Sequence, residues 1–364
     1  MGNATSPSSS RSAGARPIQP SSLTAVHKLR RLLAVAKTKK RALVLTHDNP
    51  DPDAMASAVG LAWLLRECAG IKAQAAYGGI IGRAENKAML KVLNLALEPV
   101  AKLRGTHDLL CLVDTQPEVG NYSAPTLGLD DDVAKVAIDH HPARPASALC
   151  AFQDVGGPTG ATSTLICQYL RAAGLVPSAQ LATALFYGIK SDTRDLGREV
   201  DPADLESYAW LFPYYDKTAL SQIEHPTVPA PYFAAYHLAY ERARLHGGGR
   251  AVVVDMGQVY VPEIVPEVAE KLVSLEGLRW SVATGAFLDE LYLSLRLNDK
   301  RFNAGKLVQQ VCAPFGGSAG GHGAMAGARI PLRGRHAGGL AQQLFAEFLL
   351  GFHVEPGPGI PLVP

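Results

Sequence analysis

Three hydrophobic stretches of this chain, far apart in sequence, are each followed by residues that bind metal ions. Segment 42–46 leads into His47, Asp51 and Asp53, segment 109–113 into Asp114, and segment 136–138 into Asp139, His140 and His141. A fourth carboxylate, Asp192, follows the apolar segment 185–189. Short apolar runs of this kind predict buried parallel strands, whose C-terminal ends meet at the edge of the sheet where ligands bind.

Four groups of Asp and His residues at one sheet edge are difficult to explain without cations, because neighbouring carboxylates destabilise one another. Three histidines with four or five carboxylates exceed the three protein ligands of a catalytic zinc. They suit two octahedral ions about 3.5–4 Å apart, bridged by a carboxylate and a water. A donor set of carboxylate and imidazole favours two Mn²⁺, with Mg²⁺ or Co²⁺ as substitutes. The reaction we expect is hydrolysis of a phosphate ester or anhydride by a metal-bridging hydroxide.

Each group taken alone also has a purely structural interpretation. Asp51 and Asp53 could cap the helix that follows them, and Asp114 could form a turn at the end of its strand. Asp192 could lie in a plain turn. Adjacent histidines after a buried strand are uncommon, so His140 with its neighbour is the strongest single signal. The prediction of a metal centre therefore depends on the groups occurring together.

The length of 364 residues predicts about two domains, and 47% apolar with 19% charged residues is typical of globular chains. Alternating strands and helices predict an α/β fold, with a doubly wound, mostly parallel N-terminal sheet that has helices on both faces. We expect a disordered tail over 1–22, a catalytic domain over 23–212, a linker over 213–231, a smaller α/β domain over 232–352 and a frayed tail over 353–364. Within the second domain, 316–323 is predicted to be a glycine-rich loop.

Charge and composition exclude several classes of protein. A net charge of +2 argues against a protein that grips long nucleic acid by electrostatics. No apolar run approaches the length of a membrane span, and the N-terminal region lacks the apolar core of a signal peptide. The five cysteines are scattered, which predicts buried free thiols in a reducing compartment. We therefore expect a cytoplasmic protein.

Four segments resemble, in order, the motifs of the DHH phosphoesterase superfamily. They are His-Asp-Asn-Pro-Asp-Pro-Asp-Ala at 47–54, Val-Asp-Thr at 113–115, Asp-His-His-Pro at 139–142 and Gly-Ile-Lys-Ser-Asp-Thr at 188–193. Segment 320–327 resembles the GGHxxAAG loop of the DHH-associated C-terminal domain, and 294–296 its Ser-Leu-Arg strand. The resemblance spans residues 40–350, and it implies a two-domain phosphoesterase with its active site in the interdomain cleft.

The resemblance also implies roles for individual residues. His47 and Asp51 would bind one metal, Asp53, His140 and Asp192 the other, and Asp114 would bridge them. His141 would face the substrate phosphate as a catalytic residue, with Asp139 orienting the histidines. Arg296, Gly320, Gly321 and His322 would bind the nucleotide. Leu297, Met325 and Arg194 depart from the family pattern, which bears on substrate identity more than on reaction type.

The two-domain build resembles the NrnA-like branch, which comprises oligoribonucleases and phosphoadenosine-phosphate phosphatases. This implies that the substrates are short oligonucleotides, linear dinucleotides or 3′-phosphoadenosine 5′-phosphate, and it leaves a homodimer open. A cyclic-dinucleotide phosphodiesterase would share every metal ligand, and a nucleotide-binding sensor without turnover is the alternative from another class. The inorganic-pyrophosphatase branch carries a basic Ser-Arg-Lys-Lys segment that this chain lacks.

Overall fold

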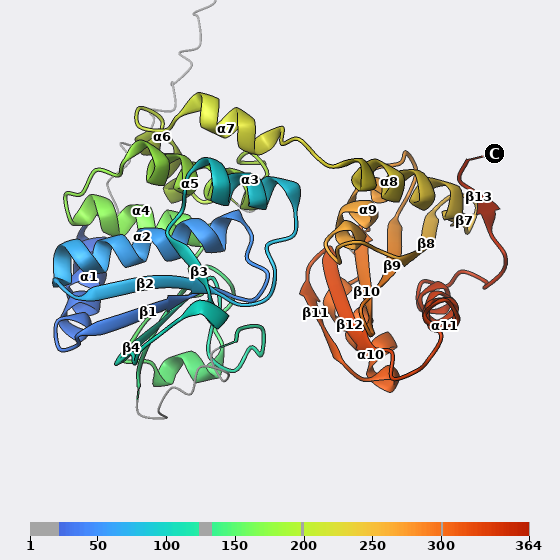
Figure 1. Cartoon of the computed structure of the whole chain (residues 1–364), viewed down its shortest axis with the longest axis horizontal. Helices are drawn as coiled ribbons and strands as arrows, with labels where there is room; N and C mark the ends of the chain where they lie inside the picture. Colours follow the sequence, from blue (N-terminus) through green and yellow to red (C-terminus); the bar gives the residue numbers. More distant parts are fainter. Residues whose placement is uncertain (1–21, 124–132, 198–199, 300, 364) are drawn as a thin grey trace, which may run out of the picture. The chain divides into compact units, whose positions relative to one another are not determined.

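The computed structural model describes residues 22–123, 133–197, 200–299 and 301–363. The tail predicted over 1–22 lies outside the described residues except for Ser22, where the first helix begins. The chain divides into two compact units: the first comprises 1–79 and 93–220, and the second comprises 80–92 and 221–364 (Figure 1). Segment 80–92 thus groups with the second unit, although the sequence placed it in the catalytic domain.

The elements up to residue 224 begin with alternating strands and helices and end with four consecutive helices. They are α1 (Ser22–Ala36), β1 (Arg41–Leu45), α2 (Pro52–Ala69), β2 (Lys72–Tyr77), α3 (Ala84–Val92), β3 (Leu97–Pro99), the 3₁₀ helix η1 (Val100–Lys102), β4 (Leu109–Val113), β5 (Ala134–Asp139), the 3₁₀ helix η3 (Pro145–Leu149), β6 (Phe152–Val155), α4 (Thr162–Ala172), α5 (Ala179–Asp192), α6 (Pro202–Leu211) and α7 (Lys217–Glu224). The short strands β3 and β6 were not predicted.

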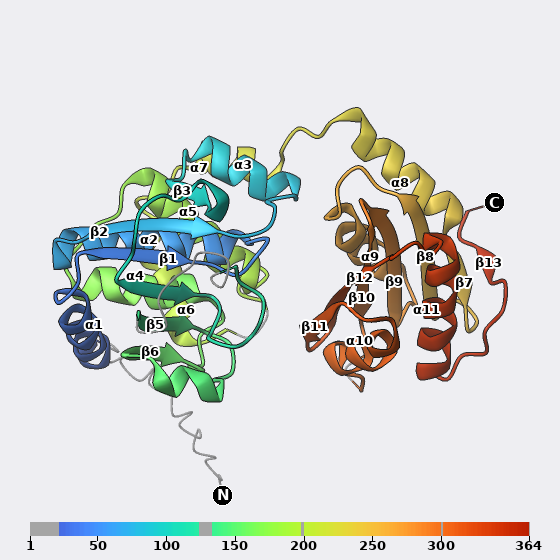
Figure 2. The same ribbon diagram turned by 60° about the horizontal axis from the view of Figure 1, so that its bottom comes forward.

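The sheet of the first unit has six parallel strands in the order β3-β2-β1-β4-β5-β6 (Figure 2). Strands β1 and β4 are almost entirely buried because their residues are apolar on both faces. Helix α2 packs against β1 and β2, and α4 and α5 pack against α2. A further apolar cluster, which includes Leu43 and Leu112, packs against Val100 of η1 and against residues such as Leu103.

The second unit is built on a mixed seven-stranded sheet in the order β11-β12-β10-β9-β8-β7-β13. Its elements are α8 (Ala230–Arg242), β7 (Arg244–His246), β8 (Ala251–Gln258), α9 (Ile264–Val273), β9 (Trp280–Phe287), β10 (Glu290–Leu297), α10 (Ala304–Cys312), the 3₁₀ helix η4 (Ala313–Phe315), β11 (Ser318–His322), β12 (Met325–Pro331), α11 (Ala337–Gly351) and β13 (Ile360–Pro361). Only β8 and β9 pair in parallel among the strands described for this sheet.

Two hydrophobic cores cover the two faces of this sheet. One core packs α8 and α9 against residues such as Val254 and Ala283. The other packs α10 and α11 against residues such as Val282 and Leu295, with Phe352 stacked on Trp280. Figures 1 and 2 show the two helix pairs on opposite sides of the strands. Among the described residues, no helix has the length and hydropathy needed to cross a membrane.

Three details of the sequence prediction are corrected. The expected linker over 213–231 contains a regular helix, α7. The expected glycine-rich loop over 316–323 is largely the strand β11, which pairs with β12 and so overrides the low strand propensity of glycine. The C-terminal tail is not frayed, because β13 pairs with β7 and Leu362 donates its N–H to the carbonyl of Ala243.

Candidate metal centre

The candidate ligands follow three neighbouring strands of the first sheet. His47 follows β1, Asp114 follows β4 and Asp139 ends β5, and these strands lie side by side in the sheet. Asp192 is the last residue of helix α5, so its carboxylate reaches the site from a helix rather than from a strand. Gly188 makes this approach possible: a Cβ there would overlap the hydroxyl of Ser163 and lie 3.2 Å from the Cα of Asp53.

Asp114 occupies the centre of the site and faces a histidine with each of its oxygens. Its Oδ2 lies 3.5 Å from Nε2 of His47, and its Oδ1 lies 3.7 Å from Nε2 of His140. The backbone of Asp114 is left-handed, with φ of 56°, a conformation that costs of order 1 kcal/mol in a non-glycine residue. The strained residue directly follows β4, and its carboxylate lies between the two histidines.

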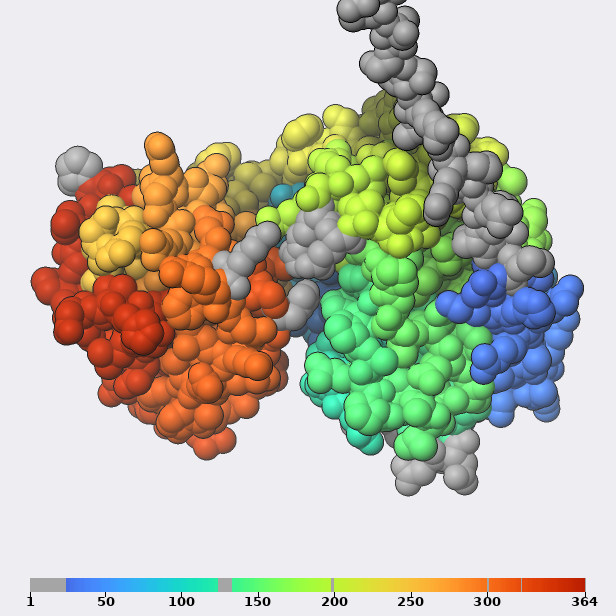
Figure 3. Space-filling view, turned by 180° about the vertical axis from the view of Figure 1, so that it is seen from behind, coloured from blue at the N-terminus to red at the C-terminus, as the bar shows by residue number. Residues whose placement is uncertain are grey.

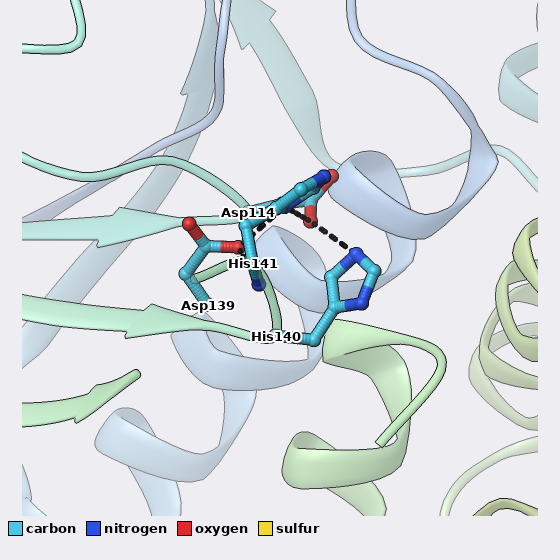
Figure 4. A group of neighbouring side chains, drawn as sticks. All are labelled: Asp114, Asp139, His140 and His141. Carbon is cyan, nitrogen blue, oxygen red and sulfur yellow. Dashed lines mark hydrogen bonds and ion pairs between the residues drawn. The ribbon is translucent and has the colours of Figure 1, made fainter. Parts of the chain in front are cut away.

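The side chains form two sets. Within each set, the candidate donor atoms all lie within 4.8 Å of one another, which is close enough for one divalent ion to contact all of them. The first set is His47, Asp51 and Asp114, and the second is Asp53, His140 and Asp192. These sets match the division implied by the family resemblance, with Asp114 close to both. A third set joins Asp114 to Asp139, His140 and His141, and Figure 4 shows these four side chains converging.

The hydrogen bonds of His47 and His140 leave Nε2 as the nitrogen that could bind a metal. His47 Nδ1 lies 2.9 Å from the carbonyl of Asp48, and His140 Nδ1 lies 3.3 Å from the carbonyl of Thr159. A carbonyl accepts but does not donate, so each Nδ1 carries the proton in the neutral ring and each Nε2 presents its lone pair. This arrangement is common for histidines that ligate metals.

The environment of His140 Nε2 tests whether a cation fits. This atom is buried and makes no geometrically sound hydrogen bond to any residue the structure describes, although Asp192 Oδ2 is 3.1 Å away. A buried nitrogen aimed at carboxylate oxygens without a hydrogen bond is costly unless another group satisfies it. A divalent ion shared by the imidazole and the carboxylates would satisfy all of them, so the donor set fits a metal.

The pKa values of the cluster show that its side chains hold protons where cations would bind. Burial opposes charge on His47, yet its hydrogen bond to Asp114 and the nearby Asp51 raise its pKa to about 10. His140 is likewise raised, against burial, to a pKa of about 10 by Asp192 and Asp114. Burial and neighbouring carboxylates raise the pKa of Asp51 to about 6 and that of Asp53 well above its usual value. Asp114, although buried, has a lowered pKa because three histidines surround it.

Comparison with known proteins agrees with this geometry. A model of the DHH family N-terminal domain matches residues 41–189, and a model of the DHHA1 domain matches residues 248–349. The chain therefore contains a DHH domain followed by a DHHA1 domain. It is 35% identical over 291 residues to the uncharacterized protein MJ1633 of Methanocaldococcus jannaschii. The match covers 80% of this chain but only 58% of that relative's length.

A solved structure shows the same fold. An exopolyphosphatase-related protein from Bacteroides fragilis superposes with a TM-score of 0.72 at 14% identity, over 90% of this chain and 96% of that one. RecJ from Thermus thermophilus, solved with Mg²⁺, gives a TM-score of 0.47 at 14% identity over 89% of this chain and 51% of RecJ. A likeness at that level is too distant to support an argument about this DHH protein.

Asp53 and Thr162 tie the two ligand sets of this DHH protein together. Asp53 is fully buried and accepts the N–H groups of Thr162 and Ser163, at 2.6 and 2.7 Å. It therefore caps the N-terminus of helix α4, whereas Asp51 caps α2, the helix in which Asp53 lies. The hydroxyl of Thr162 donates to Asp114 Oδ1 at 2.9 Å and accepts the N–H of His140. One threonine thus contacts Asp53, Asp114 and His140 at once.

Gln116 positions the carboxylate of Asp139 by a hydrogen bond. Its amide nitrogen donates to Asp139 Oδ2 at 2.7 Å, and its amide oxygen accepts the Arg144 N–H and the Ser147 hydroxyl. Asp139 Oδ1 in turn contacts His141 Nδ1 at 2.8 Å (Figure 4). Neither Gln116 nor Thr162 is among the site residues expected from the sequence. The available signal was position: Gln116 lies two residues after Asp114, and Thr162 begins the helix packed on α2.

In the second unit the residues predicted to bind nucleotide lie on neighbouring strands. Arg296 is buried on β10, where its Nη1 donates to the Ser294 hydroxyl at 2.7 Å and to the Leu295 carbonyl. The backbone register sets Arg296 opposite Met325 on β12, and Met325 opposite His322 on β11. These positions form one row across three strands. The side chain of His322 is outside the described structure.

Gly320 and Gly321 lie in the glycine hairpin, which strands β11 and β12 form, and they have different surroundings. A Cβ on Gly321, whose φ is 150°, would overlap the carbonyl of Met325 and the backbone of Ala326. A Cβ on Gly320 would meet open space within 4 Å. Glycine is therefore required at 321 for strand pairing, whereas at 320 its small size leaves the backbone accessible to a ligand.

Proposed function

We propose that this protein is a phosphoesterase that uses two Mn²⁺ ions to hydrolyse short oligonucleotides or dinucleotides, with 3′-phosphoadenosine 5′-phosphate as a further substrate. The coarser class, a metal-dependent DHH-family phosphoesterase, follows from the family and the ligand cluster together. The observation that carries the proposal is Asp114, whose two oxygens face the histidines of two separate ligand sets. A shared carboxylate of this kind is typical of two-metal sites that cleave phosphate esters.

The side chains divide the chemistry among them. When bound, the ions would neutralise phosphoryl oxygens and lower the pKa of the attacking water. His47, Asp51, Asp53, His140 and Asp192 would hold the ions, and Asp114 would fix their separation. Since Asp139 holds Nδ1 of His141, the Nε2 of that ring is the atom offered to the substrate. There it would donate a hydrogen bond or a proton to a phosphate oxygen.

We assign the selection of nucleotides to the row formed by Arg296 on β10, Met325 on β12 and His322 on β11. Arg296 can fork onto a phosphate or stack on a base. The accessible backbone around Gly320 can approach a phosphate closely because no Cβ intervenes. Met325 pairs with Arg296 on one side and with His322 on the other. Because the family pattern has alanine at this position, Met325 would narrow the space available to a base. This surface suits a small substrate end group rather than a long strand, as does the net charge of +2.

A substrate panel with Mn²⁺ tests the proposal. The panel comprises linear dinucleotides, five-nucleotide RNA and DNA, cyclic dinucleotides, 3′-phosphoadenosine 5′-phosphate and pyrophosphate, each followed by the release of mononucleotide or phosphate. Asp114→Asn should lower kcat about a hundredfold or more on every good substrate, because it removes the charge that both ion sets share. Asp289→Asn, an exposed change in the β9–β10 turn, should have no effect. A wild-type protein that binds nucleotide and releases no product would be a sensor, contrary to the proposal.

Arg296→Ala separates nucleotide binding from chemistry. If Arg296 grips the part of the substrate remote from the scissile bond, kcat/KM for dinucleotides should fall at least about tenfold while a generic aryl phosphodiester is unaffected. Leu293, on the same strand, offers a control as Leu293→Val. Equal losses of Arg296→Ala on both substrates would show that the change damages the fold or the metal site instead.

A further inference from the structure

The second unit contains a cavity of about 500 Å³ at the sheet edge opposite β11. Its walls come from the end of α8, strands β7 and β8, helix α11 and the C-terminal segment 356–358. Pairing of β13 with β7 holds that segment in place. In Figure 3 the red C-terminal surface borders the yellow surface of the α8–β7 region. The glycine hairpin is at the other edge of the sheet, so this cavity is separate from the nucleotide-binding row.

Two arginines and a histidine line the cavity. Arg242 ends α8 and makes no hydrogen bond or ion pair with any residue that the structure describes. Arg244 uses Nη1 to hold the carbonyls of Glu241 and Ala243, and its remaining N–H donors are available. His246 is only 8% exposed, and within the described part of the chain its ring makes no hydrogen bond. A buried polar ring left without a partner normally has one supplied by solvent or a ligand.

The other lining residues differ in character. Val253, Phe345 and Leu349 are apolar. Asp255 also lines the cavity, and its Oδ1 accepts the N–H of Gly257 at 3.1 Å and the hydroxyl of Thr284 at 3.2 Å. No ion pair joins Asp255 to either arginine among the described residues. The cavity therefore combines cationic donors, one acceptor and an apolar surface.

We infer that this cavity binds a small phosphate monoester. The phosphate would lie between Arg242 and Arg244, since guanidinium groups bind phosphate through paired hydrogen bonds. Burial lowers the pKa of His246, so the neutral ring would donate one further hydrogen bond. The organic part would rest on the apolar surface and donate a hydroxyl or amine to Asp255. A volume of about 500 Å³ is that of a small-molecule site and exceeds what inorganic phosphate fills.

The test is NMR titration of the full-length protein with its histidine side chains labelled, in the presence of EDTA. The His246 signal is assigned by its loss in His246→Gln, and it reports this cavity even if nucleotide also binds elsewhere. Adenosine monophosphate should shift the signal and saturate it, whereas adenosine should not. Arg242→Gln and Arg244→Gln should each raise the half-saturating concentration at least about tenfold, because each removes charge-assisted hydrogen bonds.

Arg250→Gln is the matched control. Arg250 is exposed, does not line the cavity and bonds the Gly247 carbonyl, so its loss should leave the titration unchanged. Should Arg244→Gln fail to fold, Arg242→Gln tests the inference alone. A His246 signal that does not move, or that moves equally in the arginine variants, overturns the inference. If inorganic phosphate bound with the same affinity as adenosine monophosphate, the inference that the ligand is an ester would be wrong. None of these outcomes depends on hydrolytic activity, so they are distinct from a failure of the proposed function.

Discussion

The ligand cluster of the first unit and the glycine hairpin of the second unit are organised in different ways. The cluster gathers charged side chains from four separate segments, and neighbours such as Thr162 and Gln116 hold them through hydrogen bonds. The hairpin is formed by one continuous segment at the edge of a sheet, where backbone conformation rather than side-chain contact defines the surface. Under the proposed function, chemistry would depend on convergent charges, whereas selection of the substrate would depend on where a Cβ is absent.

The two regions should also respond differently to solution conditions. The cluster contains buried carboxyl and imidazole groups whose protonation competes with metal, so changes in pH should act on metal binding. The hairpin presents its backbone at Gly320 and Gly321, so substitutions that add a single methyl group should act there and leave metal binding unchanged.

The largest expected effect is the pH dependence of metal binding. Each ligand set contains one histidine whose pKa is raised to about 10, and that proton must leave when an ion binds. The apparent affinity for each ion should therefore rise about tenfold per pH unit between about pH 6 and pH 8. Calorimetry in buffers of different ionisation enthalpy would count the released protons. Metal binding without proton release would show that the histidines are not ligands.

The same groups predict how the metal-free chain responds to pH. Folding raises the pKa of His47 and His140 above the usual value of about 6.5. Their contribution to stability is therefore fully present below about pH 6.5 and is lost as the pH rises toward 10. Excess metal should reverse this trend, since the ions replace the protons. Unfolding midpoints measured with EDTA and with Mn²⁺ would test the reversal.

The sequence predicted the ligand cluster better than it predicted the hairpin, for a physical reason. An apolar run followed by Asp or His implies a strand end, and parallel strand ends must converge, so His47, Asp114 and His140 were found from local pattern. Asp192 converges through a helix, which strand logic does not anticipate. The hairpin was predicted as a loop because glycine disfavours strands, and only pairing with β12 makes 318–322 extended. Positioning residues such as Thr162 were missed because their role depends on partners distant in sequence.

The second-largest expected effect is a loss of metal affinity when Thr162, which contacts residues of both ligand sets, is substituted. Thr162→Val keeps the N–H that binds Asp53 and removes the hydroxyl that binds Asp114. Loss of a hydrogen bond that orients a metal ligand typically costs a factor of about 10–100 in metal affinity, and we expect that loss here. Thr162→Ser retains the hydroxyl and should bind Mn²⁺ nearly as well as the wild type.

Thr164→Val supplies the matched control for that experiment. Thr164 lies on the same helix, but its hydroxyl bonds Asp204, which belongs to neither ligand set. It should lower the unfolding temperature without changing metal affinity. If both valine variants weakened metal binding equally, damage to helix α4 would explain the result, and Thr162 would have no specific role.

The smallest effect, and the one that most directly separates the two regions, compares alanine at the two hairpin glycines. Gly321→Ala would force a Cβ into the backbone of Met325 and Ala326 at a φ of 150°, so it should cost about 1–2 kcal/mol in the free energy of unfolding. Gly320→Ala meets open space and should leave stability unchanged while raising KM for dinucleotides. Metal affinity should be the same in both variants. Chemical denaturation and steady-state kinetics measure these quantities, and a Gly320→Ala protein with normal KM would show that no substrate approaches the hairpin there.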